Sequence, residues 1–275
     1  MSDSNEVRPV TQKDYVAVEE AFDAAVPHSA TRRALLDRAG KALAVIGGGA
    51  LLASAVTPAV AATNGSDSKS SRADSVHRIK SVLATFEVFG VTFVSEAVRR
   101  APGTPSAKFL PVLKSANTSE YYHLRGLERV GAEPISKRIW IPEELFGKGG
   151  AGLFKSIEQD EDIEISAYLV GVTSFARSGD AFGARLCAEA LGTEAVHRAL
   201  ARDAQSKLGA TVVNAPNDRG FESFLYQTGG DALRALEAVG VGFGKKGSKP
   251  GKFYNYPGNP LDNGTGLPLL STRAQ

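Results

Sequence analysis

Apolar residues recur every three or four positions in four long segments of the chain. This spacing is that of an amphipathic α-helix with one buried face. Glycine and proline interrupt the pattern between the segments and set the expected helix ends. The four predicted helices cover residues 76–100, 105–131, 158–177 and 180–208.

The loops between these helices predict their arrangement. Residues 101–103 (Ala-Pro-Gly) and 178–180 (Ser-Gly-Asp) are short turns, so the helices on either side of each turn should lie antiparallel. Residues 131–157 form a long connection in which no single periodicity runs. Two helical hairpins joined by one long crossover have the order of a ferritin-like four-helix bundle. The sequence therefore predicts an all-α fold with its bundle over residues 74–208.

Residues 209–275 are expected to form an extension packed on this bundle. Their pattern predicts two short helices, over 221–226 and 232–239, followed from Gly240 by an irregular strap rich in glycine, proline and asparagine. Lysines are interspersed with aromatic residues over 245–256, a pattern that also occurs in segments that bind single-stranded nucleic acid. We interpret this stretch as a solvated tail with aromatic anchors. Trp140 is expected to anchor the long connection to the bundle.

The first 61 residues have the order of an export signal. An acidic leader precedes the pair Arg32-Arg33, an uncharged run follows over 42–62, and Ala59-Val60-Ala61 resembles a cleavage site. This order predicts a twin-arginine signal and a periplasmic, cell-surface or extracellular protein without stable membrane association after cleavage. An uncleaved membrane anchor is the alternative. Residues 62–73 are expected to be a flexible linker.

Composition narrows the chemistry. The 275 residues are 43% hydrophobic and 23% charged, as in an ordinary globular protein, and a net charge of +2 does not indicate a nucleic-acid partner. The single cysteine, Cys187, excludes an intrachain disulfide and a four-cysteine zinc site, and we expect it to be a small buried residue. A bound metal would therefore need carboxylates and some of the four histidines.

Two of those histidines occur in the same local motif. Glu120-x-x-His123 lies on the second predicted helix and Glu194-x-x-His197 on the fourth. Residues three apart on a helix share a face, so the carboxylate and the imidazole of each motif can reach one metal ion or bridge two. One such match would mean little, but two matches in equivalent helices indicate a metal site.

A dinuclear carboxylate site also needs one carboxylate from each of the other two helices. In a helical hairpin, residues equally far before and after the turn lie side by side. The first turn is centred near residue 102, so the partner position of Glu120 is about residue 84, three residues from Glu87. Counting back from Glu194 about the second turn leads to residue 164, which is Glu164. The predicted metal ligands are therefore Glu87, Glu120, His123, Glu164, Glu194 and His197.

These motifs resemble the exported ferritin-like domain family, which includes plant and bacterial desiccation-related proteins. The resemblance covers roughly residues 74 to 208 and rests on Phe86-Glu87, both Glu-x-x-His motifs and the segment from Glu164 to Phe175. It implies two bound iron ions, with manganese or zinc as substitutes, and ferroxidase-like oxidation of Fe(II). Carried over by position, the terminal ligands would be Glu87 and Glu164, the bridging ligands Glu120 and Glu194, and the nitrogen ligands His123 and His197.

Three alternatives remain open at this point. Aligning Gly171 and Phe175 with the family pattern places Tyr168, and not Glu164, at the carboxylate position of the third helix. Many members of the family have no demonstrated reaction, so a metal-poor structural or stress scaffold is the second reading of the chain. Besides metal ions, a second copy of the chain is a possible partner, so the formation of a homodimer is the third open point.

Overall fold

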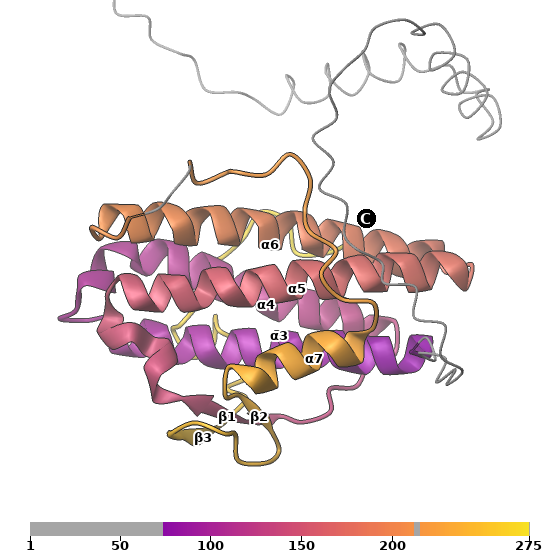
Figure 1. The fold of residues 1–275 in the computed structure, drawn as a ribbon, viewed down its shortest axis with the longest axis horizontal. Coiled ribbons are helices and arrows are strands. Elements are labelled where there is room, and N and C mark those ends of the chain that lie inside the picture. The colour runs from indigo at the N-terminus through magenta and orange to yellow at the C-terminus, as the bar shows by residue number, and fades with distance from the viewer. Residues whose placement is uncertain (1–73, 212–214, 275) are drawn as a thin grey trace, which may run out of the picture. The chain divides into compact units, whose positions relative to one another are not determined.

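The computed structural model describes residues 74–211 and 215–274. The expected export signal (1–61) and linker (62–73) lie outside these residues. The described part is mostly helical, as predicted (Figure 1). Buried side chains from its four long helices contribute to one hydrophobic core. The long helices are α3 (Val76–Arg100), α4 (Leu110–Arg129), α5 (Ala151–Arg177) and α6 (Ala181–Lys207).

The four helices pack as two hairpins. Helix α3 packs on α4 and α5, and α6 packs on the same two helices, so each hairpin lies against the other. By length and composition α3 is the one described helix apolar enough to cross a membrane, but 89% of that apolar window is buried inside the protein. A helix that is apolar on every side is expected in the core of a protein, where neighbouring elements bury all of its faces.

Local chemistry explains the helix ends. The side chain of Ser75 caps α3 by accepting a hydrogen bond from the Arg78 N–H at 3.2 Å. The side chain of Asp180 caps α6 in the same way, with the Gly183 N–H at 2.8 Å. Between α5 and α6, Gly179 turns the chain at φ +80°, a conformation that glycine adopts at little cost. These caps agree with the predicted turns.

Of two predicted helix starts, one was right and one was wrong. Helical structure begins at Pro105 with Thr104 as the N-cap, as predicted, although its first turn is a 3₁₀ helix, η1 (Pro105–Phe109), before α4 begins. The third helix begins at Ala151 and not near residue 158, because Leu153 and Phe154 are already buried on its apolar face. The acidic residues that suggested a first turn lie within the helix. Glu158, for example, accepts hydrogen bonds from side chains of α6, including the Gln205 amide at 2.6 Å.

The long connection and the C-terminal extension together form a small antiparallel sheet, which the sequence did not predict. Its strands are β1 (Arg138–Pro142), β2 (Gly242–Phe243) and β3 (Gly251–Asn255), in the order β2-β1-β3. Trp140 pairs with Phe253, and its indole N–H donates to the Lys249 carbonyl at 3.0 Å. The expected strap is therefore partly regular structure, and Trp140 anchors the connection to it. A 3₁₀ helix, η2 (Glu143–Gly149), leads from β1 to α5.

One of the two short helices predicted after the bundle is present. Helix α7 (Gly229–Ala238) begins with a capping box between Thr228 and Asp231. The helix predicted over 221–226 is wrong. The N–H groups of Leu225 and Tyr226 both donate to the hydroxyl of Ser166 on α5, at 2.7 and 3.1 Å, so this stretch lies extended along the bundle.

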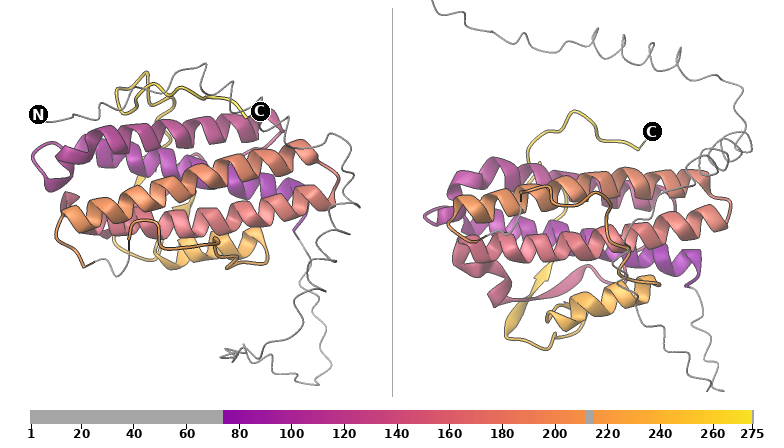
Figure 2. Two further views of the ribbon diagram at one scale, coloured as in Figure 1. Left: turned by 90° about the horizontal axis from the view of Figure 1, so that it is seen from above. Right: turned by 45° about the horizontal axis from the view of Figure 1, so that its top comes forward.

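The residues after β3, here called the C-terminal segment (256–274), run along α3 and α4 (Figure 2). The buried amide of Asn117 donates to the Thr265 carbonyl at 3.0 Å, and the Leu267 N–H donates to the Thr118 hydroxyl at 3.0 Å. The hydroxyl of Ser95 on α3 lies 3.1 Å from that of Thr265. These bonds fix the C-terminal segment to α3 and to α4, the helix that carries the first Glu-x-x-His motif.

Candidate metal centre

All four long helices send acidic or imidazole side chains to one place inside the bundle. Their donor atoms form two groups, and within each group these atoms all lie within 4.8 Å of one another. The first group is Glu87, Glu120, His123 and Glu194, and the second is Glu120, Glu161, Glu194 and His197.

The histidines make the closest approaches in each group. In the first, His123 Nδ1 lies 2.6 Å from Glu194 Oε1 and 3.7 Å from Glu87 Oε2. In the second, His197 Nδ1 lies 2.8 Å from Glu194 Oε2, 3.0 Å from Glu120 Oε1 and 3.6 Å from Glu161 Oε1. Each imidazole therefore presents one nitrogen to a set of carboxylates.

Glu120 and Glu194 belong to both groups, and this sharing joins the groups into one centre. The two oxygens of Glu194 lie on opposite sides, Oε1 toward His123 and Oε2 toward His197. The two imidazole rings lie 6.5 Å apart, centre to centre. A carboxylate that faces two positions in this way can bridge two cations.

Several of these atoms are buried without a hydrogen-bond partner. Among the described residues, both oxygens of Glu194, one oxygen each of Glu87, Glu120 and Glu161, and Nδ1 of His123 and His197 make no bond of acceptable geometry. The short distances given above therefore join atoms that point into shared space and not along hydrogen bonds. Buried charged groups are costly unless they are paired or bind a metal, so the cluster has the donor set and the geometry of a cation site.

Proton sharing compensates for part of this cost in the metal-free protein. Burial raises the pKa of the Glu87 and Glu161 carboxyls well above the usual range. Burial acts the same way on Glu194, but the two imidazoles outweigh it and hold the pKa of that carboxyl well below normal. Although burial alone would lower the pKa of His197, its contacts with Glu120 and Glu194 raise it to about 9. Without metal, the carboxyls of Glu87 and Glu161 and the imidazole of His197 therefore tend to stay protonated. A bound cation would displace these protons.

Close packing of α3 on α4 helps to position the shared carboxylate of Glu120. Gly90 stands one turn after Glu87 on α3, and a Cβ atom there would lie 3.2 Å from Glu120 Oε2. Gly90 thus leaves room for the carboxylate to pass between the two helices.

The structure brings together five of the six predicted ligands, Glu164 being the exception. Glu164 is buried on α5 with one oxygen lacking a hydrogen-bond partner, but it belongs to neither group. Glu161, one turn earlier, supplies the α5 carboxylate of the second group, and sequence reasoning missed it. Tyr168 also points inward, and its hydroxyl donates a hydrogen bond to Glu87 Oε1.

We expect Glu161→Gln to lower the metal content of the purified protein by about one ion per chain and Glu164→Gln to leave it unchanged. The reason is that Glu161 belongs to the group around His197, whereas Glu164 belongs to neither group. Both substitutions remove one buried carboxylate from α5, so each controls for the other. Metal analysis of the two variants after equal reconstitution is the measurement, and a loss confined to Glu164→Gln would contradict this assignment.

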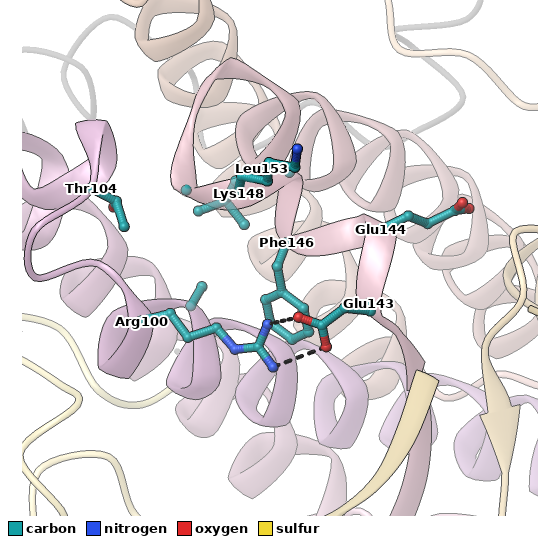
Figure 3. A pocket seen from close by; sticks show the side chains of 10 residues that line it. Arg100, Thr104, Glu143, Glu144, Phe146, Lys148 and Leu153 are labelled. Atoms are coloured by element: carbon teal, nitrogen blue, oxygen red, sulfur yellow. Dashed lines mark hydrogen bonds and ion pairs between the residues drawn. The ribbon is translucent and has the colours of Figure 1, made fainter. Parts of the chain in front are cut away.

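Cavities differ on the two sides of the centre. An apolar cavity of about 20 Å³, room for little more than one water molecule, lies against Glu161 and His197. A much larger pocket of about 610 Å³ opens beside His123. A third cavity of about 660 Å³ lies apart from the cluster, between the end of α3 and η2, where Arg100 and Glu143 pair across it (Figure 3). No residue of the candidate metal centre lines that third cavity.

Comparison with known proteins adds no family to these observations. No family model, no curated protein and no solved structure matches the chain.

Proposed function

We propose that this protein holds a dinuclear metal centre, most suitably iron, within a ferritin-like four-helix bundle that is exported from the cytoplasm. The observation that carries the proposal is the sharing of Glu120 and Glu194 by two groups, each of which also has its own histidine and its own further carboxylate. Two neighbouring cations need that arrangement, whereas a single cation or a network of ion pairs does not.

The donor set favours iron or manganese, with zinc as a substitute. Only carboxylate oxygens and imidazole nitrogens are present, and this combination without thiolate suits those metals. Bound iron would supply oxidation chemistry with dioxygen or peroxide. The chain's own part is to hold the ligands, and Tyr168 does so for Glu87 by occupying one oxygen of that carboxylate, which leaves the other for the cluster.

Metal analysis tests the proposal. Protein purified without chelators from iron-supplemented cells, or stripped and then reconstituted with Fe(II), Mn(II) or Zn(II), is expected to retain close to two ions per chain after gel filtration. We also expect the loaded protein to melt at a higher temperature, because a ligand that binds only the folded state stabilises it. If none of the three metals is retained, the proposal fails and a metal-poor scaffold becomes the better description.

A further inference from the structure

The pocket beside His123 has the size of a small-molecule site. Its volume of about 610 Å³ falls in the range of roughly 300 to 1,000 Å³ that is usual for ligand pockets. Helices α4 and α6 form two of its walls, and the C-terminal segment forms a third. His123 is the one residue of the candidate metal centre that lines it, with 13% of its side chain exposed.

Positive charge predominates around this pocket. Arg125 and Arg129 of α4 and Arg273 of the C-terminal segment line it, against Glu189 as the acidic residue. Arg125 is paired with Glu128, but within the described residues no ion pair is found for Arg129 or Arg273, and both are exposed. Two cationic side chains from different walls are thus free to meet an anion.

The remaining lining is suited to an organic molecule. Hydroxyl groups of Tyr122 and Thr272 supply hydrogen-bond donors, and Leu186 and Leu269 supply apolar surface from two different walls. An inorganic ion would bind to the hydroxyl groups and leave the apolar surface of the leucines in contact with water. A ligand with a charged end and an apolar body would use both.

Hydrogen bonds to α4 hold the C-terminal segment in place where it forms the third wall of the pocket. The hydrogen bonds of Thr265 and Leu267 to α4 fix the chain just before it reaches the pocket. Residues Leu269, Ser271, Thr272, Arg273 and Ala274 then lie along the pocket itself. The C-terminal segment and His123 therefore line the same pocket.

We propose that this pocket binds a small organic anion, with a carboxylate or phosphate group and an apolar body, and that residues 269–274 cover it. The anion would lie beside the metal position that includes His123. That neighbourhood rests on the proposed function, whereas binding by the arginines and the apolar wall does not.

Calorimetric titration of the full chain with benzoate tests the charge requirement, and benzyl alcohol is the uncharged ligand of similar shape. Metal-free protein is expected to bind benzoate at least about tenfold more tightly than benzyl alcohol, and metal-loaded protein to bind benzoate more tightly still. Equal affinity for the two ligands in both forms of the protein would overturn the proposal. If no metal loads but benzoate is still preferred, the proposed metal function fails while the pocket stands.

Variants test whether the observed site is this pocket. The double variant Arg129→Gln/Arg273→Gln is expected to weaken benzoate binding about tenfold, since two charge-assisted contacts are lost. Arg99→Gln, at an exposed arginine of α3 that does not line the pocket, is the matched control and should bind as wild type does. Equal loss in both variants would mean nonspecific charge attraction and would overturn the assignment.

A shortened chain tests whether residues 269–274 cover the pocket. A variant that ends at Pro268 keeps the hydrogen bonds of Thr265 and Leu267 but lacks the residues along the pocket. We expect weaker benzoate binding together with several-fold faster removal of metal by a chelator, while circular dichroism and melting temperature stay close to wild type. Unchanged benzoate affinity in this variant would show that residues 269–274 do not form the site.

Discussion

Glu194→Ala is expected to reduce the metal content of the protein from the proposed two ions per chain to none. Glu194 is the carboxylate whose two oxygens face the two histidines separately, so its removal takes a ligand from both positions at once. Glu120→Ala should act in the same way, because Glu120 also belongs to both groups. His123→Ala and His197→Ala each remove a ligand from one group and should retain about one ion. Metal analysis after identical reconstitution is the measurement.

Glu133→Gln is the matched control for these variants, since it removes one exposed glutamate that belongs to neither group and should leave the metal content unchanged. Circular dichroism establishes that each variant is folded before its metal content is compared. A Glu194→Ala protein that is folded and still holds two ions would refute the shared-ligand arrangement. Equal losses in the Glu194 and His123 variants would instead indicate a single metal position.

The second large effect is on the pH dependence of stability. We expect the metal-free protein to melt at a temperature lower by about 5 °C or more at pH 9 than at pH 6, and the metal-loaded protein to show a much smaller difference. Thermal unfolding followed by circular dichroism, with and without bound metal at each pH, measures this. The two forms of the same chain control for every titrating group outside the cluster.

The sign follows from the protons held by the folded cluster. The pKa of His197 is raised from 6.5 to about 9, so its stabilising contribution is complete below about pH 6.5 and is lost as the pH rises through 9. The raised carboxyl pKa values of Glu87 and Glu161 act in the same direction. The lowered pKa of Glu194 affects stability only in acid, below its ordinary value of 4.5. Bound metal replaces these protons, and a metal-free melting temperature that rises from pH 6 to pH 9 would contradict this account.

The Glu-x-x-His motifs could be found from sequence because their geometry is local. Residues three apart on a helix meet wherever the helix is placed, so Glu120 with His123 and Glu194 with His197 needed only the prediction of a helix. The scarcity of histidine then made the repetition of the motif informative. All four residues belong to the two groups, as this reasoning predicts.

The choice between Glu161 and Glu164 was beyond the same reasoning. These residues are three apart on α5, and the structure buries both. Which one reaches His197 depends on the rotation and tilt of α5 against its neighbours, and helix packing angles vary by 15 to 20° around their preferred values. The acidic run around Glu161 suggests a helix start when the sequence is taken alone, so that Glu161 is not among the ligands predicted from the sequence although it belongs to the second group.

The sheet was missed for a different reason. The strand β1 reads Arg-Ile-Trp-Ile-Pro, which is short, ends in proline and lacks a clean alternation of buried and exposed residues. Its partner β2 has only two residues, Gly242 and Phe243. Such strands are defined by their partners, which lie about a hundred residues further along the chain, and a local pattern does not contain that information.

That pairing has a consequence for the order in which the protein folds. Every residue of the candidate metal centre lies between Glu87 and His197, so the bundle can collect its ligands through contacts within and between adjacent hairpins. The strand β1, which bridges those hairpins, finds its last partner only when the chain has been synthesised beyond Asn255. Pairings of such long sequence separation form slowly. We therefore expect the helices that carry the candidate ligands to form before the sheet during synthesis, and Trp140 to remain unpaired until residues 251–255 are available.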